Sequence, residues 1–387
     1  MNRVVHIFVV LCATLSATLL SAQQNIGGHK GLNSVVVNND ASVTFSYHNP
    51  EAQSVAVKGD FITLRGETLG RIELSEAENG LWQGTTPPLA SELYYYSFIL
   101  NNNTELRDPA STYCLRDVGS LISYFVVPGG RGDLYVAQDV PHGTLARVWY
   151  SVDNTPARRM TVYTPAGYER GGRYPVLYLL HGMGGDEEAW VATGRLAEIM
   201  DNMIASGKAE PMIVVMTNGC MQHLAAPGYS SEGMWSPYMS GSMDGSFENH
   251  FGDVVTWIDR HYRTKAHRSS RAIAGLSMGG FHALHISQHY PKMFDYVALF
   301  SAAIFRGKEG VEIYEDLEAK LIRQFSYHPA LYWIGIGNED FLYEENVEFR
   351  ALLDAHNLTY TYFESSGGHT WRNWRIYLTE IATRIFK

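Results

Sequence analysis

A serine flanked by glycines marks the segment Ala274–Gly280, AGLSMGG. Gly275, Ser277 and Gly279 form the pattern G-x-S-x-G, which follows the apolar run RAIAG and precedes the helix-like run GGFHALHISQHY. A sharp strand-to-helix turn presents such a serine at the edge of a sheet, and only small neighbours fit its strained backbone. The following helix aims its N-terminal N–H groups at an oxyanion beside the serine. The pattern predicts that Ser277 is a nucleophile.

A serine hydroxyl needs a general base, and the base needs an orienting carboxylate. In hydrolases with this turn, the acid and then the histidine follow the serine along the chain. The segments WIGIGNEDF and SSGGHTWRNW supply Asp340, just past a strand, and His369, in a loop after the last strand. Glu339 is the alternative acid. The sequence therefore predicts a catalytic triad of Ser277, Asp340 and His369.

An oxyanion hole needs two backbone N–H donors. We expect Met278, the residue after the serine, to be one of them. The loop YLLHGMGGDEEAW follows an early strand and offers Met183 as the second donor, with glycines that let an ester approach the backbone. We expect His181 to fix this loop by hydrogen bonding, because no second residue stands at a metal-ligand spacing.

Substrate-binding residues are expected in the segment SSEGMWSPYMSGSMDG, Ser230–Gly245, which should cover the catalytic edge of the sheet. Trp235 and Tyr238 could stack on a flat aryl acid, since aromatic pairs add about 0.5–1.5 kcal/mol beyond burial. Their alternative role is to anchor the loop.

The elements that position these residues show two different patterns of hydrophobicity along the chain. Residues 35–128 contain short β-like runs separated by turn signals, which predicts a small all-β immunoglobulin-like sandwich. Residues 129–140, with the glycine-rich PGGRGD, are interpreted as a linker. From 141 to 387, continuously apolar strands alternate with helical runs, which predicts a doubly wound, mostly parallel sheet, an α/β-hydrolase.

Composition limits the classes of function. The chain has 387 residues, 45% hydrophobic and 18% charged, with a formal net charge of −10. This is typical of a folded protein, and the negative charge disfavours nucleic acid and anionic membranes as partners.

The N-terminus reads as an export signal. Residues 1–22 combine Arg3, an apolar run and small residues before a polar QQN, which predicts a signal peptide cleaved near Ala22 and a secreted or periplasmic enzyme of a bacterial envelope. A transmembrane anchor is the alternative, but polar residues interrupt the run.

Cleavage leaves Cys114 and Cys220, which form no disulfide framework and are interpreted as two thiols.

The segments LYLLHGMGGDEEAW, AGLSMGGFHAL, GNEDFLY and SGGHTWRNW together resemble carbohydrate esterase family 1 of the esterase D superfamily, which includes feruloyl and acetyl xylan esterases. The resemblance spans roughly residues 141–387 and implies the same triad and oxyanion donors. It also implies an enzyme without metal or organic cofactor that removes feruloyl or acetyl groups from xylan or xylo-oligosaccharides.

The N-terminal part is similar to the early-set domain called carbohydrate-binding module family 48, through VTFSYHNPEAQSVAVKGDF, GLWQGTTPPL, LYYYSFIL and RDPAS. We favour a structural module that shapes the enzyme's entrance over a sugar-binding one, because Trp82 and a few tyrosines are the only candidates for a stacking platform.

Two other functions stay open. Enterochelin (siderophore trilactone) esterases share the layout of a β domain before this hydrolase fold, although an acidic chain fits a triscatecholate poorly. A non-catalytic carbohydrate-binding protein on a hydrolase scaffold is the other alternative, which the complete triad argues against.

Overall fold

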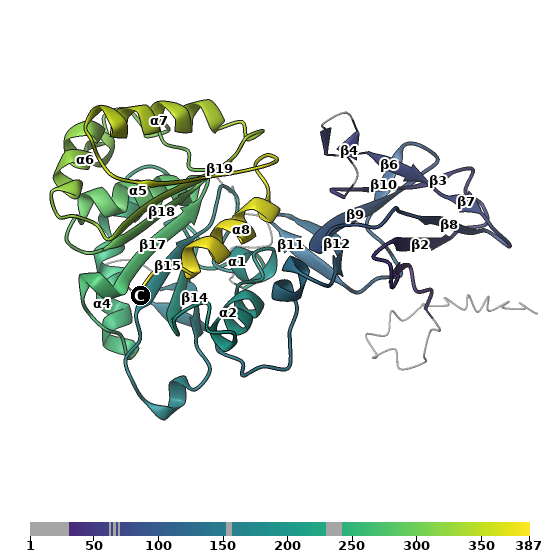
Figure 1. The fold of residues 1–387 in the computed structure, drawn as a ribbon, viewed down its shortest axis with the longest axis horizontal. Helices are drawn as coiled ribbons and strands as arrows, with labels where there is room; N and C mark the ends of the chain where they lie inside the picture. Colours follow the sequence, from purple (N-terminus) through teal and green to yellow (C-terminus); the bar gives the residue numbers. More distant parts are fainter. Residues whose placement is uncertain (1–30, 62, 65–66, 69, 152–156, 230–241) are drawn as a thin grey trace, which may run out of the picture.

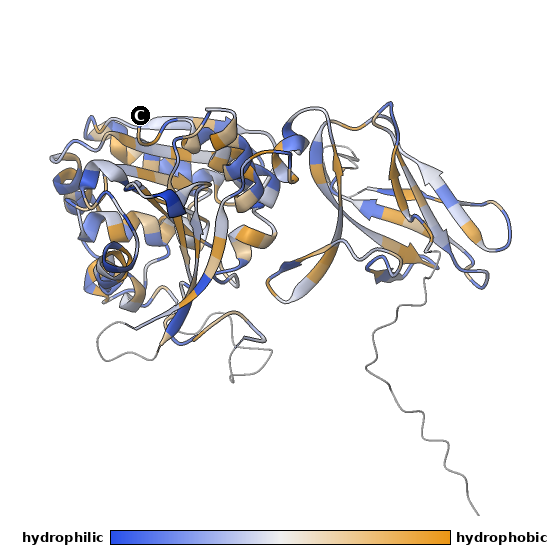
Figure 2. Ribbon diagram, turned by 90° about the horizontal axis from the view of Figure 1, so that it is seen from below, coloured by the Kyte–Doolittle hydropathy of each residue, from blue (hydrophilic) through white to orange (hydrophobic). Residues whose placement is uncertain are grey.

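The computed structural model describes residues 31–387 except 62, 65–66, 69, 152–156 and 230–241. The chain forms two lobes, an all-β domain and a larger α/β domain (Figure 1). Hydrophobic residues run along the strands of both lobes and alternate with hydrophilic ones on the helices (Figure 2). None of the helices in the described ranges is long and apolar enough to cross a membrane.

The N-terminal domain is a pair of antiparallel sheets, which confirms the predicted all-β class. One sheet has the order β1 (Val35–Val37), β2 (Val43–His48), β8 (Leu81–Thr85) and β7 (Ser75–Glu76). The other has the order β11 (Cys114–Asp117), β12 (Ser120–Val127), β9 (Glu92–Leu100), β3 (Val55–Gly59) and β6 (Arg71–Glu73), with β10 (Thr104–Leu106) also paired to β9. A separate short pair joins β4 (Thr63–Leu64) and β5 (Glu67–Thr68).

An aromatic core joins the two sheets of the sandwich. Phe45 of β2 packs on Phe125 of β12 with ring centroids 5.6 Å apart, and Tyr47 packs on Phe98 at 4.8 Å. Trp82, expected as a candidate for sugar stacking, belongs to this core: it is 8% exposed and its indole N–H donates to the Asn49 carbonyl at 3.0 Å. Trp82 therefore has no exposed face for a sugar ring.

The α/β domain is built on one eight-stranded sheet, which confirms the predicted doubly wound, mostly parallel class. Its order is β13 (Thr144–Tyr150), β14 (Arg158–Thr164), β16 (Ile213–Thr217), β15 (Val176–Leu180), β17 (Arg271–Leu276), β18 (Tyr296–Phe300), β19 (Leu331–Gly337) and β20 (Thr361–Ser365). The ladder from β16 to β20 is parallel, whereas β13 and β14 are antiparallel. The strands from β14 to β18 are buried along their length, apart from Arg271, as expected for a sheet covered on both faces.

Helices cover both faces of this sheet. One face packs on α1 (Ala189–Ala192), α2 (Leu196–Ala205) and α8 (Trp371–Ala382). The other packs on α3 (Ser246–Asn249), α4 (Phe251–His261), α5 (Met278–His289), α6 (Leu317–Phe325) and α7 (Tyr343–Ala355). Short 3₁₀ turns η2 (Tyr168–Arg170), η3 (Arg268–Ser270) and η4 (Glu312–Tyr314) lie in the connections.

The segment interpreted as a linker packs against the α/β domain. Residues Arg131–Tyr135 form a 3₁₀ helix, η1, and the Tyr135 side chain is fully buried. The Asn202 amide of α2 donates to the carbonyls of Asp133, Leu134 and Val136 at 3.0–3.2 Å. A side chain on a distant helix therefore fixes the backbone of the segment that was interpreted as a linker.

The two domains also share a hydrophobic core. Successive residues of β9 point to opposite sides of the sheet, so Tyr94, Tyr96 and Phe98 face the sandwich core while Leu93 and Tyr95 face the α/β domain. Leu115 of β11 joins the same shared core. Both faces of β9 are thus covered by protein. Cys114 is half-buried in the β domain and Cys220 is buried in the α/β domain, and no disulfide joins them.

A buried ion pair lies in the middle of the domain interface. Arg375 of α8 and Glu92 of β9 are both fully buried, with Nη2 and Oε1 3.3 Å apart. The guanidinium also donates to the Tyr95 hydroxyl at 3.1 Å, to the Leu93 carbonyl at 3.2 Å and to the Thr193 carbonyl at 3.1 Å. These acceptors pair both Nη groups of a cation that would otherwise be costly to remove from water, while its Nε has no hydrogen-bond partner among the described residues.

We expect Arg375→Ala to lower the free energy of unfolding by about 3–5 kcal/mol, because it leaves the buried Glu92 carboxylate with only the longer contacts to the partly exposed Arg131 and Arg372. Arg384→Ala is the matched control: it breaks an exposed i,i+4 pair with Glu380 just past the same helix, worth about 0.3–0.5 kcal/mol. Urea unfolding of both variants measures the difference, and equal losses would contradict this interpretation.

Candidate active site

The turn between β17 and α5 holds Ser277 in a conformation that residues other than glycine rarely adopt, with φ 54° and ψ −115°. Its N–H donates to the Phe300 carbonyl at 2.8 Å, which ties the turn to β18. A Cβ at Gly275 would lie 2.2 Å from the Gly279 carbonyl oxygen, and one at Gly279 would lie 2.5 Å from the Leu180 carbonyl oxygen. Both glycines of the G-x-S-x-G pattern are therefore required by close backbone approach.

Asp340 and His369 are brought together by loops that follow neighbouring strands, β19 and β20. The His369 Nδ1 lies 3.0 and 2.9 Å from the two carboxylate oxygens of Asp340, which is 4% exposed. The Leu342 N–H also donates to this carboxylate at 2.9 Å. Because an ionised carboxylate only accepts, Nδ1 carries the proton and Nε2 has a lone pair free to act as a base. Glu339, the alternative acid, is exposed to solvent.

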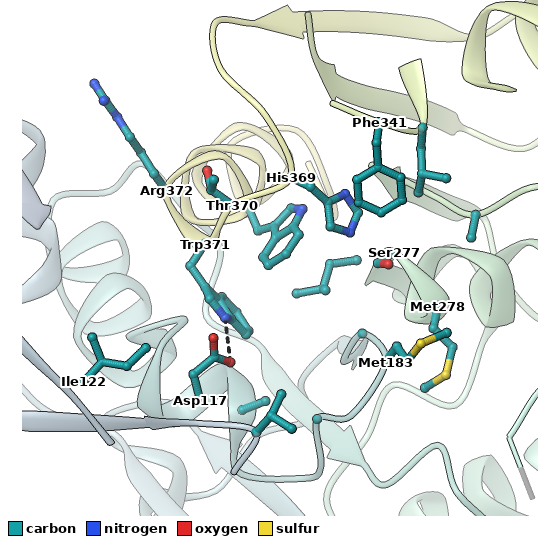
Figure 3. A pocket seen from close by; sticks show the side chains of 18 of the residues that line it. Asp117, Ile122, Met183, Ser277, Met278, Phe341, His369, Thr370, Trp371 and Arg372 are labelled. Carbon is teal, nitrogen blue, oxygen red and sulfur yellow. Dashed lines mark hydrogen bonds between the residues drawn. The ribbon is translucent and has the colours of Figure 1, made fainter. Parts of the chain in front are cut away.

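Ser277 and His369 line the same cavity, and the serine hydroxyl lies just below the imidazole in Figure 3. Met183 and Met278, the expected oxyanion donors, line it as well. Within the described ranges, neither of their backbone N–H groups donates to a protein acceptor. Met278 is the first residue of α5, so its N–H also lies at the positive end of the helix dipole.

His181, in the loop before Met183, and His285, on α5, are both buried. His181 donates from Nδ1 to the Gly182 carbonyl at 2.7 Å and accepts from the Gly219 N–H through Nε2 at 2.8 Å. These partners fix the neutral tautomer and hold the loop before Met183, as the sequence predicted. Burial lowers the pKa of His181 to about 4 and the pKa of His285, on α5, also to about 4.

Buried ion pairs support the loop that carries Met183. Glu187 is fully buried, and its carboxylate accepts from Arg159 Nε at 2.7 Å and from the Ala226 N–H at 2.8 Å. Burial raises the pKa of Glu187, and these hydrogen bonds partly oppose the rise. Glu188 pairs with both Arg159 and Arg147. The loop is therefore anchored at its C-terminal side by charged groups of β13 and β14.

The cavity at Ser277 has a volume of about 1040 Å³ and is walled by both domains. The sequence did not indicate several of its lining residues, among them Asp60, Tyr95, Asp117, Val118 and Ile122 of the N-terminal domain and Arg306 and Phe341 of the α/β domain. Phe341 directly follows Asp340, is 75% exposed and lies 4.5 Å from the His369 ring, so its place next to the acid was a usable signal.

Two expected substrate-binding residues, Trp235 and Tyr238, lie outside the described residues. Met243, from the end of the same segment, lines the cavity.

Within the described ranges, no group of three or more His, Cys, Asp or Glu side chains is placed to hold a metal ion.

The fold and this site define the class of the protein as an α/β-hydrolase. Residues 154–385 match the Esterase family, and the chain belongs to it. Residues 31–112 match carbohydrate-binding module 48, the isoamylase N-terminal domain. The family assigned from the sequence motifs is thereby confirmed.

Similar proteins include an endo-1,4-beta-xylanase/feruloyl esterase from Xylanibacter ruminicola, 30% identical over 361 residues that cover 91% of this chain and 46% of that protein. The chain thus spans less than half the length of this relative. A solved ferulic acid esterase is 28% identical, with a TM-score of 0.50, over 64% of this chain and 99% of that one. The enterobactin esterase of Shigella flexneri, 16% identical, shares the fold over 88% of this chain and 92% of its own, with a TM-score of 0.63.

We expect Asp340→Asn to lower kcat by about 10⁴-fold, because an asparagine can hold the His369 ring in the wrong tautomer. Glu339→Gln, which changes an exposed neighbour, should alter kcat only slightly. Steady-state hydrolysis of an aryl ester by the two purified variants measures this. The reverse order of effects would make Glu339 the acid.

We expect His285→Phe to make the protein less sensitive to acid. The folded pKa of His285 is about 4, below the ordinary 6.5, so the folded state binds fewer protons than the unfolded state between these values and loses stability as pH falls from 6.5 to 4. The free energy of unfolding of the variant minus that of the natural protein should therefore be about 2 kcal/mol larger at pH 4.5 than at pH 7. The control is a change at His289, exposed on the same helix, which should shift this difference less. If the stability difference between His285→Phe and the natural protein does not change with pH, the lowered pKa of His285 is refuted.

Proposed function

We propose that the protein is a secreted serine esterase that hydrolyses feruloyl or acetyl esters on plant cell-wall xylan through an acyl-enzyme on Ser277. The observation that carries the proposal is the position of His369. Its ring is bonded to the buried Asp340 carboxylate and lines the same cavity as the strained Ser277. Membership of the Esterase family and similarity to a protein named as a xylanase and feruloyl esterase support the substrate class.

In the acylation step, Ser277 Oγ attacks the ester carbonyl carbon and its proton passes to His369 Nε2. Asp340 stabilises the resulting imidazolium through Nδ1–H. The carbonyl oxygen becomes an oxyanion that accepts from the Met183 and Met278 N–H groups, which have no protein acceptor to release first. The bond to the sugar oxygen then breaks, and His369 returns its proton to that oxygen, so the sugar leaves as an alcohol.

In the deacylation step, a water molecule enters where the sugar left. His369 removes a proton from it while the water oxygen attacks the acyl carbon, and the oxyanion forms again at the same two N–H groups. Collapse of this intermediate releases the carboxylic acid and returns the proton to Ser277 Oγ. Both steps use the chain's own groups, and the triad ends in its starting protonation state.

The cavity favours a large substrate. Its volume of about 1040 Å³ lies just above the range of about 300–1,000 Å³ in which drug-sized ligands are buried, and it is far larger than an acetyl group. Phe341, exposed beside His369, offers a flat face to an aryl acid. These features support a feruloyl group with part of its sugar chain over acetyl alone.

A siderophore trilactone is the second candidate substrate, since the Shigella enterobactin esterase shares the two-domain fold. The lining of the cavity argues against a triscatecholate, because Asp60 and Asp117 balance Arg306 and Arg372 and leave no excess of positive charge. Export after cleavage near Ala22 is likewise proposed from the sequence, and residue 22 lies outside the described residues.

A panel of methyl ferulate, acetylated xylan and a trilactone siderophore tests the proposal. We expect the highest kcat/KM on methyl ferulate and a loss of at least about 10⁴-fold in Ser277→Ala, because removal of the nucleophile leaves the rate that the oxyanion hole and binding supply. A fluorophosphonate should label Ser277 in the natural protein.

Activity of Ser277→Ala within a few-fold of the natural protein would remove the nucleophile assignment. A preference for the siderophore trilactone would show that the proposed substrate class, feruloyl or acetyl esters on xylan, is wrong. A protein that binds xylan but neither reacts with the fluorophosphonate nor cleaves any ester would be a non-catalytic sugar-binding protein.

A further inference from the structure

Strand β11 of the N-terminal domain contacts the loop that carries Met183 and the helix that follows His369. Its last two residues, Arg116 and Asp117, reach the loop of Met183 and the start of the helix that follows His369. We propose that these two side chains are positioning residues for catalysis, so that the β domain takes part in turnover as well as in covering the core. This inference rests on the proposed function.

The first contact fixes the oxyanion loop. Arg116 Nη2 donates to Asp186 Oδ1 at 2.7 Å, and the Asp186 side chain is only 5% exposed. The same oxygen accepts the Glu188 N–H at 2.9 Å, which closes the turn leading into α1. Arg116 Nη1 donates to the Val118 carbonyl of its own hairpin at 2.9 Å, so the guanidinium is held from the β-domain side. Asp186 stands three residues after Met183, and the contact therefore limits where the Met183 N–H can point.

Charge makes this contact specific. Three consecutive acidic residues, Asp186, Glu187 and Glu188, are buried, and arginines of β13 and β14 neutralise the last two. Arg116 is the cation paired with Asp186. Without it, the Asp186 carboxylate would stay buried beside two other carboxylates, and repulsion favours displacement of the loop toward water.

The second contact reaches His369 through aromatic rings. The Trp371 indole N–H donates to Asp117 Oδ1 at 3.2 Å, the bond drawn in Figure 3. The Trp371 ring meets the Trp374 ring edge to face with centroids 5.1 Å apart, and Trp374 meets the His369 ring in the same way at 4.9 Å. Trp371 also packs at 5.3 Å on Trp190 of α1, the helix that follows the oxyanion loop. A shift of Trp371 would therefore disturb both the His369 ring and the helix that follows the oxyanion loop.

The position of β11 makes both contacts possible. It is the edge strand of its sheet, lies at the junction of the two lobes near α1 and α8 in Figure 1, and is anchored by Leu115, which belongs to the core shared with the α/β domain. Adjacent residues of a strand point in opposite directions, so Arg116 and Asp117 can serve two separate loops from one short segment.

The test measures kcat and KM for a small ester, p-nitrophenyl acetate, which should not need the sugar-binding part of the cavity. We expect Arg116→Ala and Asp117→Ala each to lower kcat about ten-fold with KM changed less than two-fold. This is less than the 10²–10³-fold cost of deleting an oxyanion donor, because the donor is displaced rather than removed. Arg116→Ala should cause no further loss in an Asp186→Ala background.

Conservative variants separate positioning from other roles. Asp117→Asn keeps an oxygen acceptor for the Trp371 N–H and should retain most of kcat, and Arg116→Lys should recover part of it. The matched control is Lys58→Ala, which breaks an exposed ion pair with Glu105 in the same domain and should leave kcat unchanged. Thermal unfolding of every variant shows whether it is folded, and if an alanine variant is unfolded, the Asn and Lys variants carry the test.

Unchanged kcat in folded Arg116→Ala and Asp117→Ala would overturn the inference, and so would an equal loss in Asp117→Asn and Asp117→Ala, which would indicate a direct role of the charge. These outcomes are distinct from failure of the proposed function. In that case the natural protein would hydrolyse none of the esters, or Ser277→Ala would be as active as the natural protein.

Discussion

A cation buried between two domains is the constraint on which the rest of this structure depends. Arg375 has no contact with water, and its acceptors come from β9 and from Thr193 beyond α1. It lies on α8, whose first turn carries Trp374 against His369 and Trp371 against Trp374. The helix that packs against the proposed base is thus fixed by the same residue that pairs with Glu92 across the domain interface. A hydrolase domain with this α8 needs the β domain to satisfy Arg375.

The proposed catalytic groups were predicted from local patterns alone. Ser277 lies in a turn that only glycine neighbours permit, and Asp340 and His369 follow apolar strands whose ends meet at one edge of a parallel sheet. Each of these signals is complete within about ten residues. The strand and helix periodicities behind them also predicted the fold class of both domains, because burial on both faces leaves continuous apolar runs in the parallel strands.

The domain interface could not be predicted in this way, because its partners are distant in sequence. Arg116 and Asp186 are 70 residues apart, and Asp117 and Trp371 are 254 residues apart. The Gly-rich segment around Arg131 was interpreted as a linker, since nothing local reveals the Asn202 side chain that binds its backbone. One local signal was available: LYYYSFIL of β9 lacks the apolar–polar alternation of a sheet with a solvated face.

The two-sided burial of β9 and β12 bears on how such chains are assembled in evolution. A module joined through an exposed linker can be gained, lost or exchanged between genes without changing its neighbour. Here the outer face of the second sheet carries Leu93, Tyr95 and Val126 against the α/β domain, and the charge on Arg375 needs Glu92. Recombination at residues 129–140 would expose an apolar face on one product and an unpaired cation on the other. The two domains are therefore constrained to be inherited, and to vary, as a single unit.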